Sequence, residues 1–168
     1  RDSIARFASA NYLPENSAKS TAGLIADECS RLYQGKPGDD ATIAVLRVRR
    51  RHPVNLVVGP PASKDQDMKM MNLFFAKEGA KIVCGGTTSR LAADYLRKPL
   101  APSLDYPDPD VPPVSEIDGV DLVTEGVVTL SKVLSYAKDF LQSARLAPVW
   151  AVGRDGASCI ARELFENA

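Results

Sequence analysis

From Val54 onward the sequence repeats one pattern: a short apolar run, a break that contains glycine, and a segment whose apolar residues recur at helical spacing. The apolar runs are 54–58, 81–84 and 121–124. Parallel strands need a connection of about a dozen residues or more, which a helix supplies. The alternation therefore predicts an α/β fold, with a mostly parallel sheet flanked by helices in a Rossmann-like arrangement of three layers.

Start and stop signals mark the helices within this pattern. Ser63 and Gln66 form an S-x-x-Q capping box ahead of the first helix, and Gly79 ends that helix. Asp155 is expected to cap a last helix, which follows a short fourth strand at 149–152. The apolar face of the helix after the third strand is marked by four residues: Leu130, Leu134, Ala137 and Leu141.

Two stretches differ from the repeating pattern. The segment 99–113 is rich in proline and aspartate, which predicts an excursion over the surface rather than a helix or a central strand. The N-terminal segment, residues 1–51, is typical of two helices and a strand, with Ser17 as N-cap of the second helix and an apolar alternation at 43–48 that indicates a buried strand. The sequence thus divides into this N-terminal segment and an α/β domain at 54–168.

The charges of the chain are balanced, with 21 Lys and Arg against 21 Asp and Glu. With no net charge, the chain has no overall electrostatic attraction to nucleic acid or to a membrane. The basic hinge 49–53 is either a solvated linker or a local patch for an anion or nucleic acid. No apolar run reaches the ~18 residues of a membrane span. The three cysteines lack disulfide or zinc spacing, so a cytoplasmic protein is expected. Because the chain begins at Arg1 without Met or a signal peptide, we expect a fragment of a longer protein.

Asp39 and Asp40 follow a Pro-Gly turn and precede the apolar alternation at 43–48. Hard divalent cations such as Mg²⁺ and Mn²⁺ prefer oxygen ligands held on rigid elements, which two carboxylates at the mouth of a strand would supply. The alternative is that the pair only shapes a turn and caps it.

The order of these elements carries a family resemblance. The chain has an amphipathic helix, followed by Lys36-Pro37-Gly38-Asp39-Asp40-Ala41-Thr42 and the apolar run 43–48. This order resembles the end of the SpoIIE/RsbU-like branch of PP2C-type serine/threonine phosphatases. The domain at 54–168 resembles the α/β tail that follows some of these phosphatases, for which no activity is assigned. The resemblance implies that 1–51 is the terminal helix and strand of a PP2C-like α/β sandwich.

In that family the strand carries a metal-binding aspartate, which falls by position on Asp39, with Asp40 as the second candidate. The implied reaction is hydrolysis of phosphoserine or phosphothreonine in a phosphoprotein by a water that bridges two Mn or Mg ions. The other metal-ligand motifs of the family are missing from this sequence. The resemblance therefore implies that the chain has no phosphatase activity alone.

Loops that leave neighbouring parallel strands converge at one edge of a sheet, where ligands usually bind. Glycines let the backbone approach a ligand, and the start of a helix with two threonines offers N–H and hydroxyl donors, which suit a small anion. The candidate ligand residues are Gly59, Gly85, Gly86, Thr87, Thr88, Glu125 and Gly126.

Several alternatives stay open for these residues. Gly85 and Gly86 would also make a plain tight turn, with a threonine capping the helix, and Glu125 would also complement a helix dipole. Cys84 is either a reactive thiol at a helix start or a small buried hydrophobe. The alternative to a regulatory domain of a phosphatase is a small-anion-binding or dimerisation module without catalysis. A separate enzyme activity in this domain is disfavoured, because the one histidine, His52, lies in the hinge.

Overall fold

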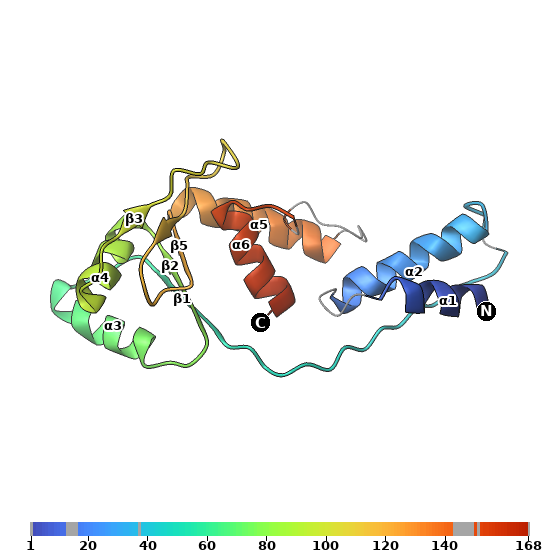
Figure 1. Ribbon diagram of the computed structural model, residues 1–168, viewed down its shortest axis with the longest axis horizontal. Coiled ribbons are helices and arrows are strands. Elements are labelled where there is room, and N and C mark those ends of the chain that lie inside the picture. Colours follow the sequence, from blue (N-terminus) through green and yellow to red (C-terminus); the bar gives the residue numbers. More distant parts are fainter. Residues whose placement is uncertain (1, 13–16, 37, 143–149, 151, 168) are drawn as a thin grey trace. The chain divides into compact units, whose positions relative to one another are not determined.

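The computed structural model describes residues 2–12, 17–36, 38–142, 150 and 152–167 (Figure 1). Contacts divide the chain into two compact units. The first contains the residues up to Arg50 together with Gln142, and the second contains Arg51–Leu141 and the segment from Trp150 onward.

The first unit is a pair of helices, α1 (Asp2–Ala10) and α2 (Ala18–Leu32), which contact each other. The predicted N-cap of α2 is confirmed, since Ser17 Oγ accepts a hydrogen bond from the Ser20 amide at 3.0 Å. Neither helix contains a buried residue. The first unit therefore lacks a closed apolar core among its described residues.

The predicted strand at 43–48 is wrong for this structure. These residues form no strand, and the side chains of Leu46 and Val48 are both 89% exposed. A strand needs a neighbour that pairs its backbone groups and covers one of its faces. The sheet among the described residues begins only at Val54, so the apolar alternation has no such neighbour.

The second unit contains one five-stranded sheet with the order β1-β2-β5-β4-β3. The α/β class is confirmed, and the three predicted strands pair in parallel; they are β1 (Val54–Val58), β2 (Ala80–Cys84) and β5 (Leu122–Thr124). The sequence pattern missed two short antiparallel strands, β3 (Ala101–Pro102) and β4 (Ser115–Glu116). The sheet is therefore mixed, and Pro102 is tolerated because β3 is an edge strand.

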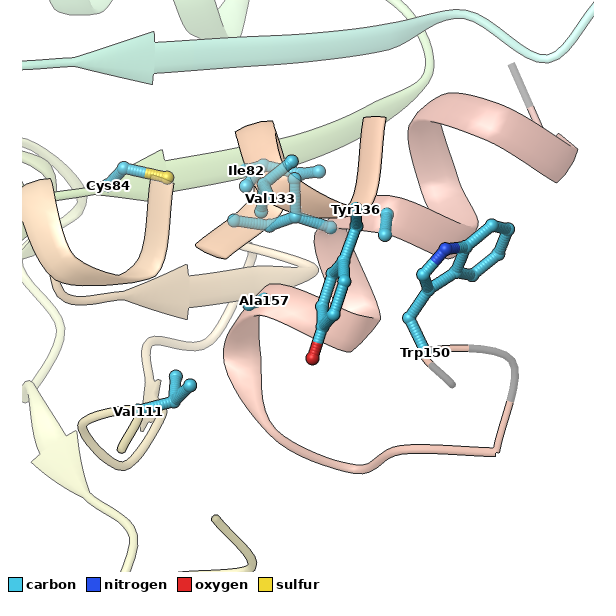
Figure 2. Close-up of a cluster of buried hydrophobic side chains, with 9 residues drawn as sticks. Ile82, Cys84, Val111, Val133, Tyr136, Trp150 and Ala157 are labelled. Carbon is cyan, nitrogen blue, oxygen red and sulfur yellow. The ribbon is translucent and has the colours of Figure 1, made fainter. Parts of the chain in front are cut away.

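Helices cover both faces of this sheet, because successive residues of a strand point to opposite faces. The first face, with Val57, Val83 and Val123, packs against α3 (Asp67–Phe75) and α4 (Gly86–Leu96). The second face packs against α5 (Val127–Gln142) and α6 (Gly156–Arg162). Figure 2 shows the second cluster, in which Val133 and Tyr136 of α5 lie beside Ile82 of β2.

The predicted apolar face of α5 is right in part. Leu130 packs against the core and Ala137 is half-buried, but Leu134 and Leu141 are 57% and 82% exposed, and the buried residues are Thr129, Val133 and Tyr136. Both sets recur at helical spacing, so periodicity alone does not decide between them. Tyr136 is favoured because the core on that face also receives the ring of Trp150 (Figure 2).

The remaining helix signals have mixed outcomes. The capping box is wrong, because a 3₁₀ turn at Lys64–Gln66 separates Ser63 from α3, and the Ser63 hydroxyl bonds to Asp65 instead. The cap of α6 is confirmed, since Asp155 Oδ1 accepts from the amides of Ala157 and Ser158, both at 3.0 Å.

The predicted fourth strand at 149–152 is not formed by the residues that are described. Val149 and Ala151 lie outside the described residues, while Trp150 and Val152 are not in a strand. Trp150 is buried instead, with ring centroids 5.5 Å from Phe165 and 5.9 Å from Phe140. Its large ring fills the core between helices, which outweighs the β-propensity of the short segment.

Candidate functional site

The candidate site lies where β2 and β5 end. These strands are parallel neighbours, and their last residues, Cys84 and Thr124, are register partners. The chain then turns to opposite faces of the sheet, since α4 packs against the first face and α5 against the second. Neighbouring parallel strands whose helices diverge in this way form the crevice where α/β proteins usually bind ligands.

Two glycines lie where the loops after β2 and β5 approach each other. The Gly85 amide donates to the Thr124 carbonyl at 2.9 Å, and Gly85 has a φ of 104°, which favours glycine. A Cβ atom on Gly126 would lie 3.3 Å from Gly85 Cα. Gly85 and Gly126 are therefore needed for the close approach of the two loops, which supports the tight-turn alternative for Gly85.

Thr88, in the first turn of α4, has a hydroxyl without a partner. The side chain is fully buried, and Oγ1 has no hydrogen-bond partner among the described residues. A Cβ atom on Gly85 would lie 3.5 Å from Thr88 Oγ1, so this oxygen faces the Gly85 turn. An unpaired buried polar group costs about 1–3 kcal/mol. A hydrogen-bonding group that reached the Gly85 turn would therefore remove this cost.

The start of α4 adds backbone donors beside this hydroxyl. The N-cap is Gly85, and no side chain caps the helix. The first N–H groups of a helix have no partner inside it and carry a partial positive charge. The Gly85 amide is already paired with the Thr124 carbonyl, and both the amide and the hydroxyl of Ser89 donate to the Gly85 carbonyl. The backbone donors left at the start of α4 are therefore those of Gly86, Thr87 and Thr88.

The start of α5 differs, because it is capped by an acid. Glu125 is exposed, and its Oε2 accepts from the Val128 amide at 3.3 Å, which supports the helix-dipole alternative for this residue. Thr129, in the first turn of α5, has a second fully buried hydroxyl without a partner among the described residues. Sequence reasoning missed Thr129, because nothing in the sequence separates it from the exposed threonine Thr87.

All seven predicted ligand residues lie at this edge of the sheet. Gly59 follows β1, whose last residue, Val58, pairs with Cys84, and the others follow β2 and β5. Gly86 has open space around its Cα, whereas Thr87 is exposed on the first turn of α4. The convergence follows from the parallel pairing, and anion binding at this edge stays a prediction.

Cys84 lies at the end of β2 as a buried side chain. Burial raises the pKa of the Cys84 thiol, because a thiolate would lose its hydration, and the hydrogen bond with Thr124 acts in the opposite direction. Thr124 Oγ1 lies 3.2 Å from Cys84 Sγ. These contacts support the alternative in which Cys84 is a small buried hydrophobe.

Asp39 and Asp40 do not fit a two-metal centre by themselves. Both are exposed, and Asp39 Oδ1 accepts from the Asp40 amide at 2.8 Å, as in a plain turn. Within the described ranges, no group of three or more His, Cys, Asp or Glu is positioned to hold a metal ion. Mg²⁺ demands near-octahedral oxygen coordination, which two adjacent exposed carboxylates do not provide.

A cavity that sequence reasoning missed lies at the opposite edge of the sheet, where β2 and β5 begin. Its volume is about 460 Å³, and it is lined by His52, Gly79, Ala80, Ile82, Asp121, Leu122, Cys159, Arg162 and Glu163. Arg162 donates to the carbonyls of Trp150 and Gly153, so it holds the preceding loop. Burial raises the pKa of Cys159. No local motif links residues so far apart in the sequence.

No helix in the described portion of the chain has the length and apolar character of a membrane span. Comparisons of the chain with protein-family models, with curated proteins and with solved structures found no match.

Proposed function

We propose that the α/β domain at 54–168 is a small-anion-binding module that regulates a metal-dependent serine/threonine phosphatase. The proposal has a binding half, which is anion binding by this domain, and a phosphatase half, which is its link to the enzyme. The observation that carries the binding half is the Thr88 hydroxyl, which is fully buried beside the Gly85 turn at the start of α4 and has no partner among the described residues. The phosphatase half depends on the resemblance of the segment 36–48 to the end of the PP2C family.

The chemistry at the start of α4 favours a phosphate or carboxylate group. Its donors are backbone N–H groups with a partial positive charge, together with a hydroxyl, and no acidic residue lies in the first turn of α4. The open space at Gly86 lets a ligand approach the backbone. Glu125 is exposed on the neighbouring β5 loop, where its carboxylate would accept a hydrogen bond from a hydroxyl of the same ligand. A phosphorylated metabolite that also carries hydroxyl groups is the ligand class that matches both sides.

A thermal-shift comparison with isosteric variants tests the binding half. Inorganic phosphate and sugar phosphates are added to wild type, Thr88→Val and Thr87→Val. Wild type should gain stability, by about 2.7 kcal/mol when the ligand reaches a hundred times its dissociation constant. Thr88→Val should lose that gain without becoming less stable itself, because it removes an unpaired buried hydroxyl.

The exposed-site control, Thr87→Val, should keep the response to phosphate. Gly86→Val, which introduces a side chain into open space at the turn, should lose it. If neither phosphate nor any sugar phosphate stabilises wild type, or if Thr88→Val responds as wild type does, the binding half is wrong.

The phosphatase half makes a separate prediction. Asp39 is the metal ligand proposed from the resemblance, and the chain offers no further set of metal ligands among its described residues. We expect no manganese-dependent phosphate release from a phosphopeptide by this chain alone. Robust turnover would contradict the assignment of a regulatory role. A gene without acidic metal-ligand motifs ahead of this chain would contradict the link to a phosphatase and leave the binding half intact.

A further inference from the structure

The cavity at the edge where β2 and β5 begin lies within the second unit, on the second face of the sheet. Its apolar lining includes Ile82 and Leu122, which are register partners and belong to the cluster on that face, and Ala80, two residues before Ile82 on the same strand. The volume of about 460 Å³ lies within the range of roughly 300–1,000 Å³ that is typical of small-molecule sites. The cavity is therefore large enough for a small organic molecule with an apolar part.

Backbone contacts fix the wall of this cavity on the side of the hinge. The Ala80 amide donates to the Pro53 carbonyl at 2.9 Å, and Gly79 has a φ of 98°. A Cβ atom on Gly79 would lie 2.1 Å from the Pro53 carbonyl oxygen, so no other residue fits there. The start of β2 thus holds the end of the hinge beside the cavity, which brings His52 into its lining.

Arg162 supplies a positive charge to the cavity, and its guanidinium is held in place. It is the last residue of α6, which continues into a π-helical turn, η3 (Glu163–Asn167), a rare form that occurs frequently at functional sites. Nη1 donates to the carbonyls of Trp150 and Gly153, and Nη2 lies 3.3 Å from Cys159 Sγ. Because a guanidinium has five N–H groups, Nε–H and one Nη2–H remain without a partner among the described residues.

Two carboxylates line the same cavity, and neither forms an ion pair with a described residue. One oxygen of each already has a donor: Asp121 Oδ2 accepts from the Lys81 amide at 2.7 Å, and Glu163 Oε1 accepts from Asn167 Nδ2 at 3.1 Å. Glu163 Oε2 is buried and has no partner among the described residues. A buried charged oxygen without a donor is destabilising, so a donor group that reached it would be favourable.

We infer that this cavity binds a free amino acid with an apolar side chain, whose carboxylate pairs with Arg162 and whose ammonium group pairs with Asp121 and Glu163. Arginine is well suited to a carboxylate, because two of its N–H groups can bond both oxygens. A simple anion would also meet the two carboxylates, and a simple amine would also meet the guanidinium. A small zwitterion matches both signs of charge, and its side chain would cover Ile82 and Leu122.

The inference does not depend on the anion site at the start of α4, which lies at the opposite edge, where β2 and β5 end. The two sites differ in their chemistry as well. The start of α4 has no acidic residue in its first turn, whereas the cavity has two carboxylates. Failure of one site to bind its ligand would therefore leave the other unaffected.

Cys159 lines the cavity and serves as a reporter in the unmodified chain. The rate of its labelling by a thiol reagent is measured by peptide mass spectrometry with leucine, methionine or phenylalanine present. At least one of these amino acids should slow the labelling of Cys159 saturably, and the labelling of Cys29, in the first unit, should not change. If none of the three protects Cys159, the inference is wrong.

Two analogues of leucine, 4-methylpentanoate and 3-methylbutylamine, test the need for both charges. Each keeps the side chain and one charge of leucine, and each should need about tenfold more ligand for half-protection, because a hydrogen-bonded charge is lost. Equal protection by either analogue would overturn the zwitterion as the ligand class.

Variants of nearly the same shape test the two carboxylates. Asp121→Asn and Glu163→Gln keep an acceptor for Lys81 and Asn167, so both should retain the far-ultraviolet circular dichroism of the wild type. Each should raise the concentration of amino acid for half-protection by about tenfold. Glu116→Gln, an exposed position on β4 outside the cavity lining, is the matched control and should respond as wild type does. Wild-type protection in both Asp121→Asn and Glu163→Gln would contradict the inference.

Discussion

The two apolar alternations on either side of the hinge have opposite outcomes. Residues 43–48 and Val54–Val58 are similar in composition, yet only the second forms a strand. The first has no neighbouring strand among the described residues, whereas the second pairs with β2 and contributes Val57 to a buried cluster. Residues with β-propensity therefore form a strand here only where another strand pairs with them and a core covers one face.

The largest expected effect tests the core of the second unit. Trp150→Ala removes a buried ring that contacts Phe140 and Phe165, and should cost about 3–5 kcal/mol of unfolding free energy in urea. Tyr12→Ala, at a 60% exposed position of the first unit, should change it by less than about 0.5 kcal/mol. Equal losses of unfolding free energy in the two variants would contradict the finding that only the second unit has a closed apolar core.

A smaller effect tests the contact between the two glycine loops. Gly126→Ala introduces a Cβ atom 3.3 Å from Gly85 Cα and should cost about 1–3 kcal/mol through overpacking. Gly86→Ala meets nothing within 4 Å and is the matched control, expected to be neutral or slightly stabilising. Urea unfolding measures both, and a neutral Gly126→Ala would contradict the close approach of the loops.

The two helix caps compare the units directly. Asp155→Ala removes an acceptor for two amides and for the Ser158 hydroxyl in a buried setting, and should cost about 1–2 kcal/mol. Ser17→Ala removes the cap of α2, which has no buried residue, and should lower helicity by circular dichroism more than it lowers the urea midpoint. A urea midpoint that falls more for Ser17→Ala than for Asp155→Ala would contradict this difference between the units.

The pKa of Cys84 predicts slow labelling and a pH effect. Since burial raises this pKa, the folded protein keeps the thiol proton to higher pH than the unfolded chain. The resulting stability is fully present below the unfolded thiol pKa of about 8.5 and is lost as pH rises through the folded pKa. A thiol reagent should label Cys29, which is partly exposed, before Cys84. Equal labelling rates would contradict the buried assignment.

The smallest effect concerns the unpaired alternation. Leu46→Ser alters a side chain that is 89% exposed and should change the unfolding free energy by less than about 0.5 kcal/mol. Leu56→Ser, in the paired strand β1, should lower the unfolding free energy by more than Leu46→Ser does. A large loss for Leu46→Ser would mean that this segment has a packed neighbour after all.

Most features set by neighbours in sequence could be predicted, the capping box at Ser63 being the exception, whereas several features set by distant contacts could not. The caps Ser17 and Asp155 act within three residues and were predicted correctly. The apolar face of α5 was predicted only in part, at Leu130, because the buried positions depend on Trp150 and on Ile82, which are distant in sequence. The positions of the glycine loops followed from parallel pairing, but the partnerless hydroxyls of Thr88 and Thr129 became visible only through burial.

The central claim is that the start of α4 binds a small anion. The most direct measurement is a titration of the isotopically labelled chain with inorganic phosphate, followed by amide chemical shifts. The account predicts saturable shifts at Gly85, Gly86 and Thr88, all absent in Thr88→Val. Shifts confined to the basic hinge 49–53, or no saturable shift at the start of α4, would contradict it.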